Sequence, residues 1–283
     1  MTTFEQIFFW VSIFTYAIGS LLVAWRFVLG RGRGARWEGW LILTGLAANL
    51  LTLSLRVAQG GHLFAGQRYE DTLVVAAVAV AIYLVWQWKL PSTGLLGLIW
   101  LPLCFLLLGL GYFSDRSLKP LKAAFLSPWM MVHGLFALLG TVCFLLAAGI
   151  GVFYLLKARY PAGEEPVRLA SLPSLDMLSE LSIRLVLFGF FAWTVMLISG
   201  AIWAKDLYGS YWSWDPVETW SLISWLAWGI YVHLSLTFRR WGRLLAWLGI
   251  ACLLTSLVSM WGTGLVTTGT FHNLQLITNG LNN

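Results

Sequence analysis

The sequence predicts an all-α integral membrane protein, a bundle of about eight transmembrane helices with both termini on the extracytoplasmic side. Three observations support this fold class. First, 59% of the 283 residues are hydrophobic and only 11% are charged, whereas soluble domains carry about 25% charged residues. Second, the mean hydropathy is +0.78, and the apolar residues gather in runs long enough to span a bilayer. Third, basic residues alternate between the connections. A soluble enzyme and a disordered chain are both excluded.

Eight apolar runs are candidate spans, and the connections contain no repeat, low-complexity tract or domain linker. We therefore expect a single membrane domain over residues 1–283. No basic residue precedes the first run and a second span follows it directly, so we do not expect a cleavable signal peptide. The runs cover, in order, about residues 8–29, 38–56, 72–90, 94–111, 128–156, 182–203, 217–237 and 244–262.

The charge on the connections predicts the orientation of the bundle. Connections on one side hold 12 of the 18 Lys and Arg residues, and those on the other side hold six. The cytoplasmic side carries the excess of Lys and Arg. The loops near 58–71, 112–127 and 204–216 and the tail after 262 are therefore expected outside. The net charge of +6 is then a topology signal, and we expect no nucleic acid as a partner.

The connection between the sixth and seventh spans, at about 203–220, is unusually aromatic. One interpretation is local. Asp215 caps the seventh span, Pro216 takes its first helical position, Glu218 stands at N3 as in a capping box, and the rings form an interfacial belt. The other interpretation is a platform for a large planar ligand. The rings concerned are those of Tyr208, Tyr211, Trp212, Trp214 and Trp220.

Two of the four histidines are expected near this loop. Ser127 is a suitable N-cap and Pro128 a suitable first helical residue, which puts His133 about 8 Å below the outer end of the fifth span. His272 stands in the outer tail. An ionisable residue in a membrane segment is a site hypothesis by default, and neutral imidazole is a common axial ligand of haem iron. The two imidazoles could bind a porphyrin from opposite faces; an ordinary hydrogen bond is the alternative for each.

His233 is expected far from that pair. It follows Pro216 by 17 residues in the seventh span, so it lies about 25 Å further along the helix, near the cytoplasmic leaflet. The small Gly229 on the same helix face leaves room for a bulky neighbour. The alternative is a histidine that reaches the membrane interface. The three cysteines are scattered singly, which argues against a thiol-redox or thiolate-metal role.

The run from Tyr208 to Trp220 resembles the W-G-x-x-W-x-W-D-x-x-E signature of the haem-handling membrane proteins of cytochrome c maturation. Its Asp-Pro-x-Glu-Thr-Trp ending resembles the CcsA/ResC branch more than CcmC or CcmF. Tyr208 stands where that family usually has Trp, and Val217 where Lys is common. The resemblance extends over about residues 55–275, and the first two spans carry little of it.

This resemblance implies a haem-handling subunit of a system II cytochrome c synthase, acting with a ResB/CcsB-type membrane subunit as a cytochrome c haem lyase. Such a protein moves haem b across the membrane and presents it for thioether attachment to the Cys-x-x-Cys-His segment of apocytochrome c. The resemblance gives His133 and His272 axial roles outside, and gives His233 an inner axial role shared with the partner subunit. No catalytic nucleophile is expected in this chain, since the substrate supplies both thiols.

The first outer loop also resembles this family. His62, Tyr69 and Glu70 match its G-H-x-P-x-x-N-x-Y-E-S pattern, whereas Phe64 and Gln67 depart from it. We expect His62 to wall the outer pocket or contact a partner. Arg68 either pairs with a haem propionate through its guanidinium fork or is a surface residue.

Three other functions stay open. A CcmC-like chaperone would export haem without attaching it. A b-type electron-transfer protein needs histidine pairs at matched depth, and only His233 is expected to be deep. A solute transporter usually has polar features near the midplane, where few are expected here. The membrane is either a bacterial inner membrane or a thylakoid membrane.

Overall fold

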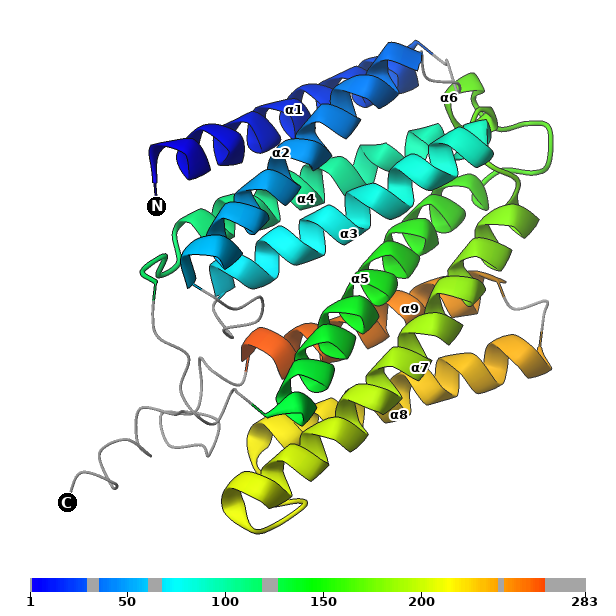
Figure 1. The fold of residues 1–283 in the computed structure, drawn as a ribbon. Helices are drawn as coiled ribbons and strands as arrows, with labels where there is room; N and C mark the ends of the chain where they lie inside the picture. The colour runs from blue at the N-terminus through cyan, green and yellow to red at the C-terminus, as the bar shows by residue number, and fades with distance from the viewer. Residues whose placement is uncertain (1, 30–35, 61–67, 119–126, 239–241, 263–283) are drawn as a thin grey trace. The chain divides into compact units, whose positions relative to one another are not determined.

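The computed structural model describes residues 2–29, 36–60, 68–118, 127–238 and 242–262, and every regular element in these ranges is helical (Figure 1). Seven helices in the described ranges are long and apolar enough to cross a membrane. An eighth long helix, α8 (Pro216–Thr237), contains several Ser and Trp residues and His233 and is not among those seven. The predicted all-α membrane fold is confirmed. The predicted sidedness of the termini stays a prediction.

The chain divides into two compact units, each described here by itself. Unit 1 comprises residues 1–126 and 149–182, and unit 2 comprises 127–148 and 183–283. Two continuous helices, α5 (Pro128–Lys157) and α7 (Leu175–Tyr208), contribute to both units. The expectation of one membrane domain over the whole chain stays a prediction.

Unit 1 is built on two neighbouring helix pairs. Helix α1 (Thr3–Val28) packs on α2 (Arg36–Gly60), and α3 (Arg68–Lys89) packs on α4 (Gly97–Tyr112). Contacts of α1 with α4 and of α2 with α3 join the pairs (Figure 1). The fourth predicted span begins as a 3-10 helix, η1 (Pro91–Leu96). The end of α5, the short α6 (Val167–Ala170) and the start of α7 complete the unit.

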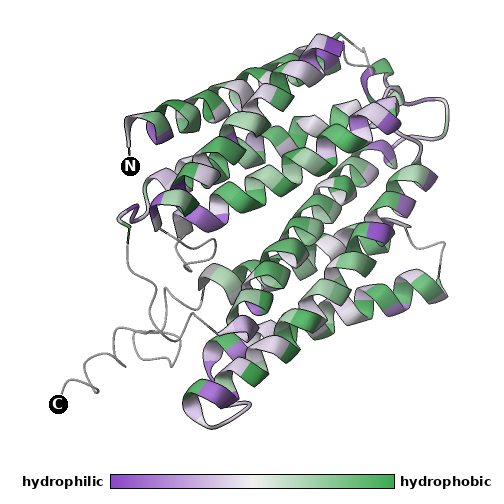
Figure 2. Ribbon diagram, viewed as in Figure 1, coloured by the Kyte–Doolittle hydropathy of each residue, from purple (hydrophilic) through white to green (hydrophobic). Residues whose placement is uncertain are grey.

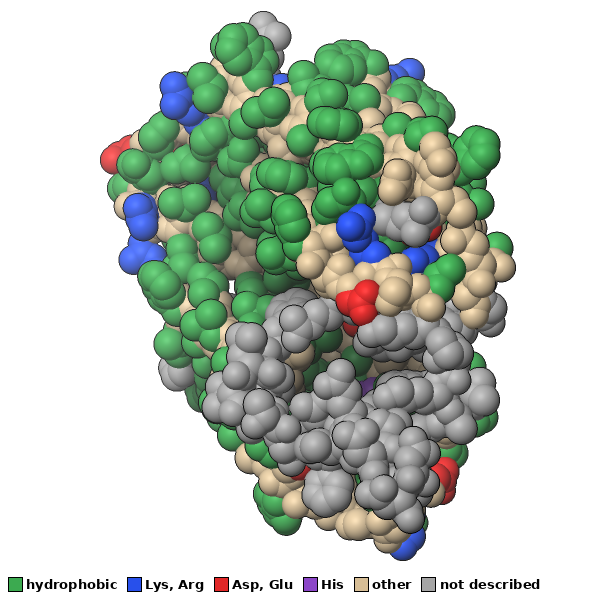
Figure 3. All heavy atoms as spheres, turned by 90° about the vertical axis from the view of Figure 1, so that its left-hand side faces the viewer, with side chains coloured by type: hydrophobic (Ala, Val, Ile, Leu, Met, Phe, Trp, Pro, Cys, Tyr) green, Lys and Arg blue, Asp and Glu red, His purple; other side chains and the backbone are tan. Residues whose placement is uncertain are grey.

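The surface of the helices is that of a protein surrounded by lipid. Figure 2 shows hydrophobic residues along the helices and hydrophilic residues mainly at helix ends and connections. Figure 3 shows hydrophobic side chains over much of the described surface on one face. Leu21 and Leu110, for example, are 71% and 68% exposed. Apolar patches of this extent face a membrane or a partner.

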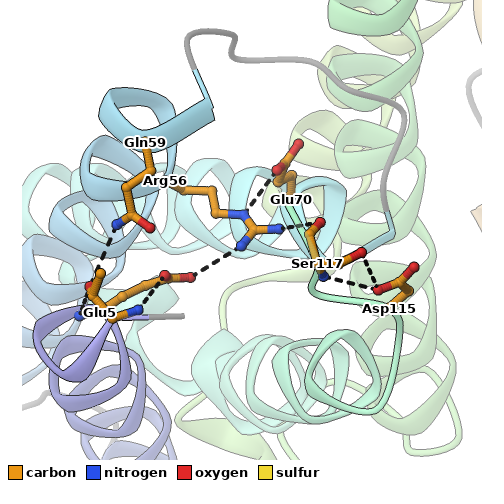
Figure 4. Close-up of polar contacts among 7 residues, drawn as sticks. Glu5, Arg56, Gln59, Glu70, Asp115 and Ser117 are labelled. Carbon is orange, nitrogen blue, oxygen red and sulfur yellow. Dashed lines mark hydrogen bonds and ion pairs between the residues drawn. The ribbon is translucent and has the colours of Figure 1, made fainter. Parts of the chain in front are cut away.

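Buried charges join α1 and α2 at both of their ends. At one end Arg56 Nε donates to Glu70 Oε1 over 3.0 Å, Nη2 donates to the Ser117 carbonyl over 3.2 Å, and Nη1 lies 3.8 Å from Glu5 Oε1 (Figure 4). At the other end Arg26 Nε lies 2.9 Å from a Glu38 carboxylate oxygen. Breaking such a buried pair by removing one partner is strongly destabilising.

Unit 2 consists of the first two thirds of α5, most of α7, α8, α9 (Gly242–Leu257) and a π-helical turn, η3 (Val258–Gly262). Helices α5 and α7 approach closely at Gly189, where a Cβ would lie 2.8 Å from the Phe144 ring. The indole N–H groups of Trp225 and Trp228 donate to Thr194 Oγ1 and Ser256 Oγ, each over 2.9 Å. These bonds tie α8 to α7 and to α9.

An aromatic stack fills the centre of unit 2. The rings of Phe144 and Trp228 are parallel within 7°, with centroids 4.0 Å apart. Trp193 lies against the same Phe144 at 5.0 Å, and Tyr231 lies against Trp228 at 5.7 Å. All four side chains are at most 2% exposed. The unit therefore has a closed aromatic core, and the cavity described below lies on one side of it.

Candidate functional site

The aromatic connection between α7 and α8 is a tight, hydrogen-bonded loop. Helix α7 ends at Tyr208, and the next residue, Gly209, has a φ of +78°, in the left-handed region where glycine carries no Cβ penalty. The Gly209 N–H donates to the Lys205 carbonyl over 2.9 Å, and Lys205 Nζ donates back to the Gly209 carbonyl over 2.7 Å. Trp214, just before α8, also has a positive φ, of +60°. The loop thus leaves α7 and enters α8 through two left-handed residues.

The start of α8 confirms the predicted cap. Asp215 is the N-cap and its Oδ1 accepts from the Glu218 N–H over 2.8 Å, while Pro216 is the first helical residue. Glu218 stands at N3, and its Oε2 accepts from both N–H and Oγ of Ser213, at 2.7 and 3.1 Å. The Glu218 carboxylate thus reaches back to a residue before the cap. Asp215 and Glu218 therefore hold the loop on the helix end.

This loop borders a cavity of about 210 Å³ in unit 2. Helices α5, α7 and α8, the loop and η3 supply its walls, which are mostly apolar. One imidazole and one carboxylate are among the lining groups, and no Lys or Arg of the described residues lines it. The lining residues are His133, Ala137, Thr141, Trp193, Met196, Leu197, Gly200, Ala201, Trp203, Ala204, Tyr211, Trp212, Val217, Glu218, Ser221, Ser259 and Met260.

His133 is the imidazole of this cavity. Helix α5 begins at Pro128 as predicted, and His133 Nδ1 lies 2.9 Å from the Met196 carbonyl on α7. A carbonyl oxygen only accepts, so Nδ1 carries the proton and the lone pair of the neutral ring is on Nε2. The ring packs against Gly200, where a Cβ would lie 2.6 Å from Nδ1. The missing side chain at Gly200 therefore allows the imidazole to reach its carbonyl partner.

The deep end of the cavity lies at the level of Trp193. This residue precedes Trp203 by ten positions on α7, which corresponds to about 15 Å. Nearby, Thr141 Oγ1 donates to Met260 Sδ over 2.9 Å. Met260 belongs to η3, and π-helical turns of this kind are frequent at functional sites. The buried indole Nε1 atoms of Trp193 and Trp212 have no acceptor among the described residues, so a bound molecule with hydrogen-bond acceptors would suit this cavity.

The predicted aromatic residues divide into two groups. Tyr211 and Trp212 line the cavity. Tyr208 instead packs edge-on against Trp203, while Trp214 and Trp220 are 69% and 36% exposed, and none of these three lines it. The Trp212 and Trp214 rings meet at 83°, edge to face. The loop is thus no flat stack of five rings; two of them form part of the cavity rim.

The other predicted site residues lie away from the cavity or outside the described part of the chain. His233 is exposed on the second half of α8 and does not line the cavity. It shares an exposed helix face with Leu226 and Ile230. His62 and His272 lie outside the described residues, and so does the side chain of Arg68. Among the described residues no group of three or more His, Cys, Asp and Glu side chains could hold a metal ion.

The sequence reasoning missed much of the cavity wall. Trp193, Met196 and Met260 stand in apolar spans without any motif around them, and they line the cavity. The sequence contains one indication of the cavity. Gly200 and Ala204 are four residues apart, so they give one face of α7 only small side chains. The wall on η3 had no such signal, because a π-helical turn shifts the helical register.

The fold and the site define an all-helical membrane protein with an apolar, aromatic-rimmed cavity and one oriented imidazole. A family model described as "Cytochrome C assembly protein" matches residues 68–271. The chain therefore belongs to the cytochrome C assembly protein family, and within it to the CcsA proteins. This confirms the resemblance drawn from the aromatic loop.

Named relatives support the same placement. The chain is 30% identical over 257 residues to the cytochrome c biogenesis protein CcsA of Parasynechococcus marenigrum, covering 81% of this chain and 84% of that protein. It is 30% identical over 204 residues to CcsA of Chlamydomonas reinhardtii, covering 69% of this chain but only 57% of that protein.

A solved structure shares the fold. The cytochrome c haem lyase CcmF has a TM-score of 0.67 to this chain at 18% sequence identity. The match covers 92% of this chain and 47% of that one, so this chain spans about half the length of CcmF. The likeness concerns the helical architecture.

Proposed function

We propose that this protein is the haem-handling subunit of a system II cytochrome c synthase, which presents haem b to apocytochrome c. The single observation that carries the proposal is the imidazole of His133, oriented by the Met196 carbonyl at the wall of an aromatic-rimmed cavity. Metal-binding histidines almost always donate their other ring N–H to a carbonyl, carboxylate or water. The family membership and the names of the relatives point to the same activity.

The cavity suits part of a haem molecule better than a whole one. Its walls are apolar, its rim is aromatic, and its two unpartnered indole N–H groups suit an acceptor such as a propionate. Its volume of about 210 Å³ lies below the 300–1,000 Å³ typical of drug-sized ligands. A bound porphyrin would therefore extend beyond the rim. That arrangement leaves one edge accessible to a second reactant.

The chemistry needs a second axial ligand and two thiols. We assign the second ligand to His272 of the tail, so that two imidazoles would hold the iron of haem b. The three cysteines of the chain are buried, and the thiols come from the Cys-x-x-Cys-His segment of apocytochrome c. Each thiol adds across one vinyl group: one C–S bond forms and the thiol proton moves to the neighbouring vinyl carbon, without net redox change. The chain contributes positioning of the reactants.

His233 is assigned to an inner haem site. A polar side chain on an exposed, otherwise apolar face of a membrane helix is costly unless it is paired, and His233 with Leu226 and Ile230 forms such a face. A ResB/CcsB-type subunit packed on this face would supply the second imidazole. Haem would then pass from the inner site to the outer cavity, which we assign to the extracytoplasmic side of a bacterial inner or thylakoid membrane.

The remaining sequence-predicted residues take supporting roles. Tyr211 and Trp212 contact the porphyrin, and Asp215 and Glu218 hold the loop in place. Tyr208 supports the rim through Trp203. Trp220, the fifth residue of α8, is assigned to the aromatic platform as well. Arg68 is assigned to a propionate, and His62 to the wall of the outer pocket or to a partner contact.

Substitution of His133 tests this function. The variant His133→Ala, purified with co-expressed ResB-type subunit, should lose the absorption spectrum of the outer haem and the covalent haem on a reporter apocytochrome. Added imidazole should restore part of both, since it replaces the missing ligand. His233→Ala is the matched control, because it should lose the inner haem and keep an outer site that can be loaded with added haem.

Two results would contradict parts of the proposal. A His133→Ala protein with the spectrum and the cytochrome yield of the wild type would remove the axial role. Haem bound and released by the wild type, with no covalent cytochrome even with the partner present, would favour the CcmC-like chaperone instead.

A further inference from the structure

Two neighbouring tryptophans of the aromatic loop face different surroundings. Trp212 is half-buried, lines the cavity and has a buried Nε1. Trp214, two residues later, is 69% exposed and does not line the cavity. Their rings touch edge to face, with centroids 5.8 Å apart. The Trp212 indole therefore belongs to the cavity lining, whereas the Trp214 indole lies beside it, outside the cavity, and is exposed.

The backbone holds Trp214 outward at a conformational cost. Its φ of +60° lies in the left-handed region, which bulky side chains rarely adopt. The residues around it are tied to α8. Thr219 Oγ1 donates to the Trp214 carbonyl over 3.3 Å, Ser213 donates to Glu218, and Asp215 is the N-cap. Strained, over-determined residues of this kind cluster at functional sites. The strained backbone thus places a large aromatic side chain where most of its surface is exposed.

Trp214 is one of two largely exposed rings in this loop. The Tyr211 ring, at the cavity rim, is 59% exposed, and Lys205 Nζ lies 5.6 Å from its centre. Exposed Trp and Tyr rings are typical of protein interaction surfaces, where Trp, Tyr and Arg dominate the binding energy. Because Tyr211 also lines the cavity, these exposed rings adjoin the place assigned to the porphyrin.

We propose that Trp214 and Tyr211 form the docking surface for the haem-attachment segment of apocytochrome c. The partner is an unfolded polypeptide that carries two cysteine thiols and a histidine. This inference rests on the proposed function for the identity of the partner. It assigns Trp214 to the polypeptide rather than to the porphyrin, with Trp212 and Tyr211 at the boundary between the two. Docking here brings the thiols to the porphyrin edge that extends beyond the rim.

The test compares the roles of Trp212 and Trp214 by measuring porphyrin binding and peptide binding on the full-length protein. Trp214→Asn and Trp214→Gly remove the ring with residues that tolerate φ of +60°, so the loop should keep its conformation. We expect each to bind iron protoporphyrin IX within about twofold of the wild type. Binding of a labelled Cys-x-x-Cys-His peptide should weaken by about tenfold or more, the effect of losing a Trp anchor. Trp212→Ala should show the opposite pattern. Trp247→Ala removes an equally exposed tryptophan on α9 as a control.

Each result that differs from these expectations contradicts one part of the docking proposal. Equal loss of porphyrin affinity in Trp214→Asn and Trp212→Ala would return Trp214 to the porphyrin platform. Wild-type peptide binding by Trp214→Asn would refute the docking role of Trp214 and favour a role at the membrane interface. The peptide is measured with and without porphyrin. A wild type that binds peptide but no porphyrin would refute the proposed function and leave the docking surface, and the reverse would refute the docking surface alone.

Discussion

Gly200 shows how much of the site depends on one absent side chain. His133 and Met196 lie on different helices, and their 2.9 Å contact exists only because no Cβ at Gly200 fills the space beside the imidazole. The sequence located His133 near the outer end of its helix, because Ser127 and Pro128 mark the helix start. It could not reveal the Met196 carbonyl, since that partner is 63 residues away and depends on how two helices meet.

A single methyl group should therefore disturb the site. In Gly200→Ala the new Cβ would lie 2.6 Å from His133 Nδ1, so the ring must move and lose its carbonyl partner. We expect porphyrin affinity to fall by about tenfold, the lower end of the effect of losing such a partner. Gly134→Ala is the matched control on α5, where a Cβ meets nothing within 4 Å. Porphyrin titration measures both, and equal affinities would contradict the orienting role of the carbonyl.

The exposure of Trp214 was equally beyond the sequence. The residue pattern placed five aromatic side chains in one loop, but which of them faces the cavity depends on two left-handed residues, Gly209 and Trp214. A glycine with positive φ is foreseeable at a helix end. A tryptophan with positive φ is not, because its own preferences oppose that conformation.

At the scale of elements, helix starts and spans were the best-predicted features. All eight predicted spans coincide with helical segments, since about 20 apolar residues in lipid have few alternatives to a helix. The differences lie at the ends. Helix α7 begins at Leu175, seven residues before the predicted span, and η1 and η3 are 3-10 and π turns that hydropathy does not distinguish. The Arg56 ion pairs were also missed, because they join residues of three different helices.

The cap of α8 can be separated from any direct role of its charge. Asp215→Ala removes the acceptor for the Glu218 N–H and should lower the free energy of unfolding by about 1 kcal/mol. Asp215→Asn keeps a good cap without the charge and should cost only a few tenths of a kcal/mol. Thermal unfolding in detergent measures the first effect, and porphyrin titration checks the second variant. A loss of porphyrin binding in Asp215→Asn would show that the carboxylate itself takes part.

At the scale of the molecule, the sidedness of the membrane protein is the prediction on which the outer location of the cavity depends. The three native cysteines are at most 4% exposed, so they give little background for thiol labelling. A cysteine in place of exposed Asp206, beside the aromatic loop, should react with a membrane-impermeant maleimide added outside intact cells. A cysteine in place of exposed Ala162, between α5 and α6, should react only after lysis. The reverse labelling pattern would show that the protein has the opposite orientation in the membrane.

The stacked pair of Phe144 and Trp228 lies directly behind Trp193, which lines the cavity. Phe144 and Trp228 do not line the cavity themselves, and with Tyr231 they form a close-packed group of buried rings next to it. A porphyrin could pass through the centre of this unit only if the stacked rings of Phe144 and Trp228 separated. In the proposed function, haem would therefore have to reach the cavity without crossing this group of rings.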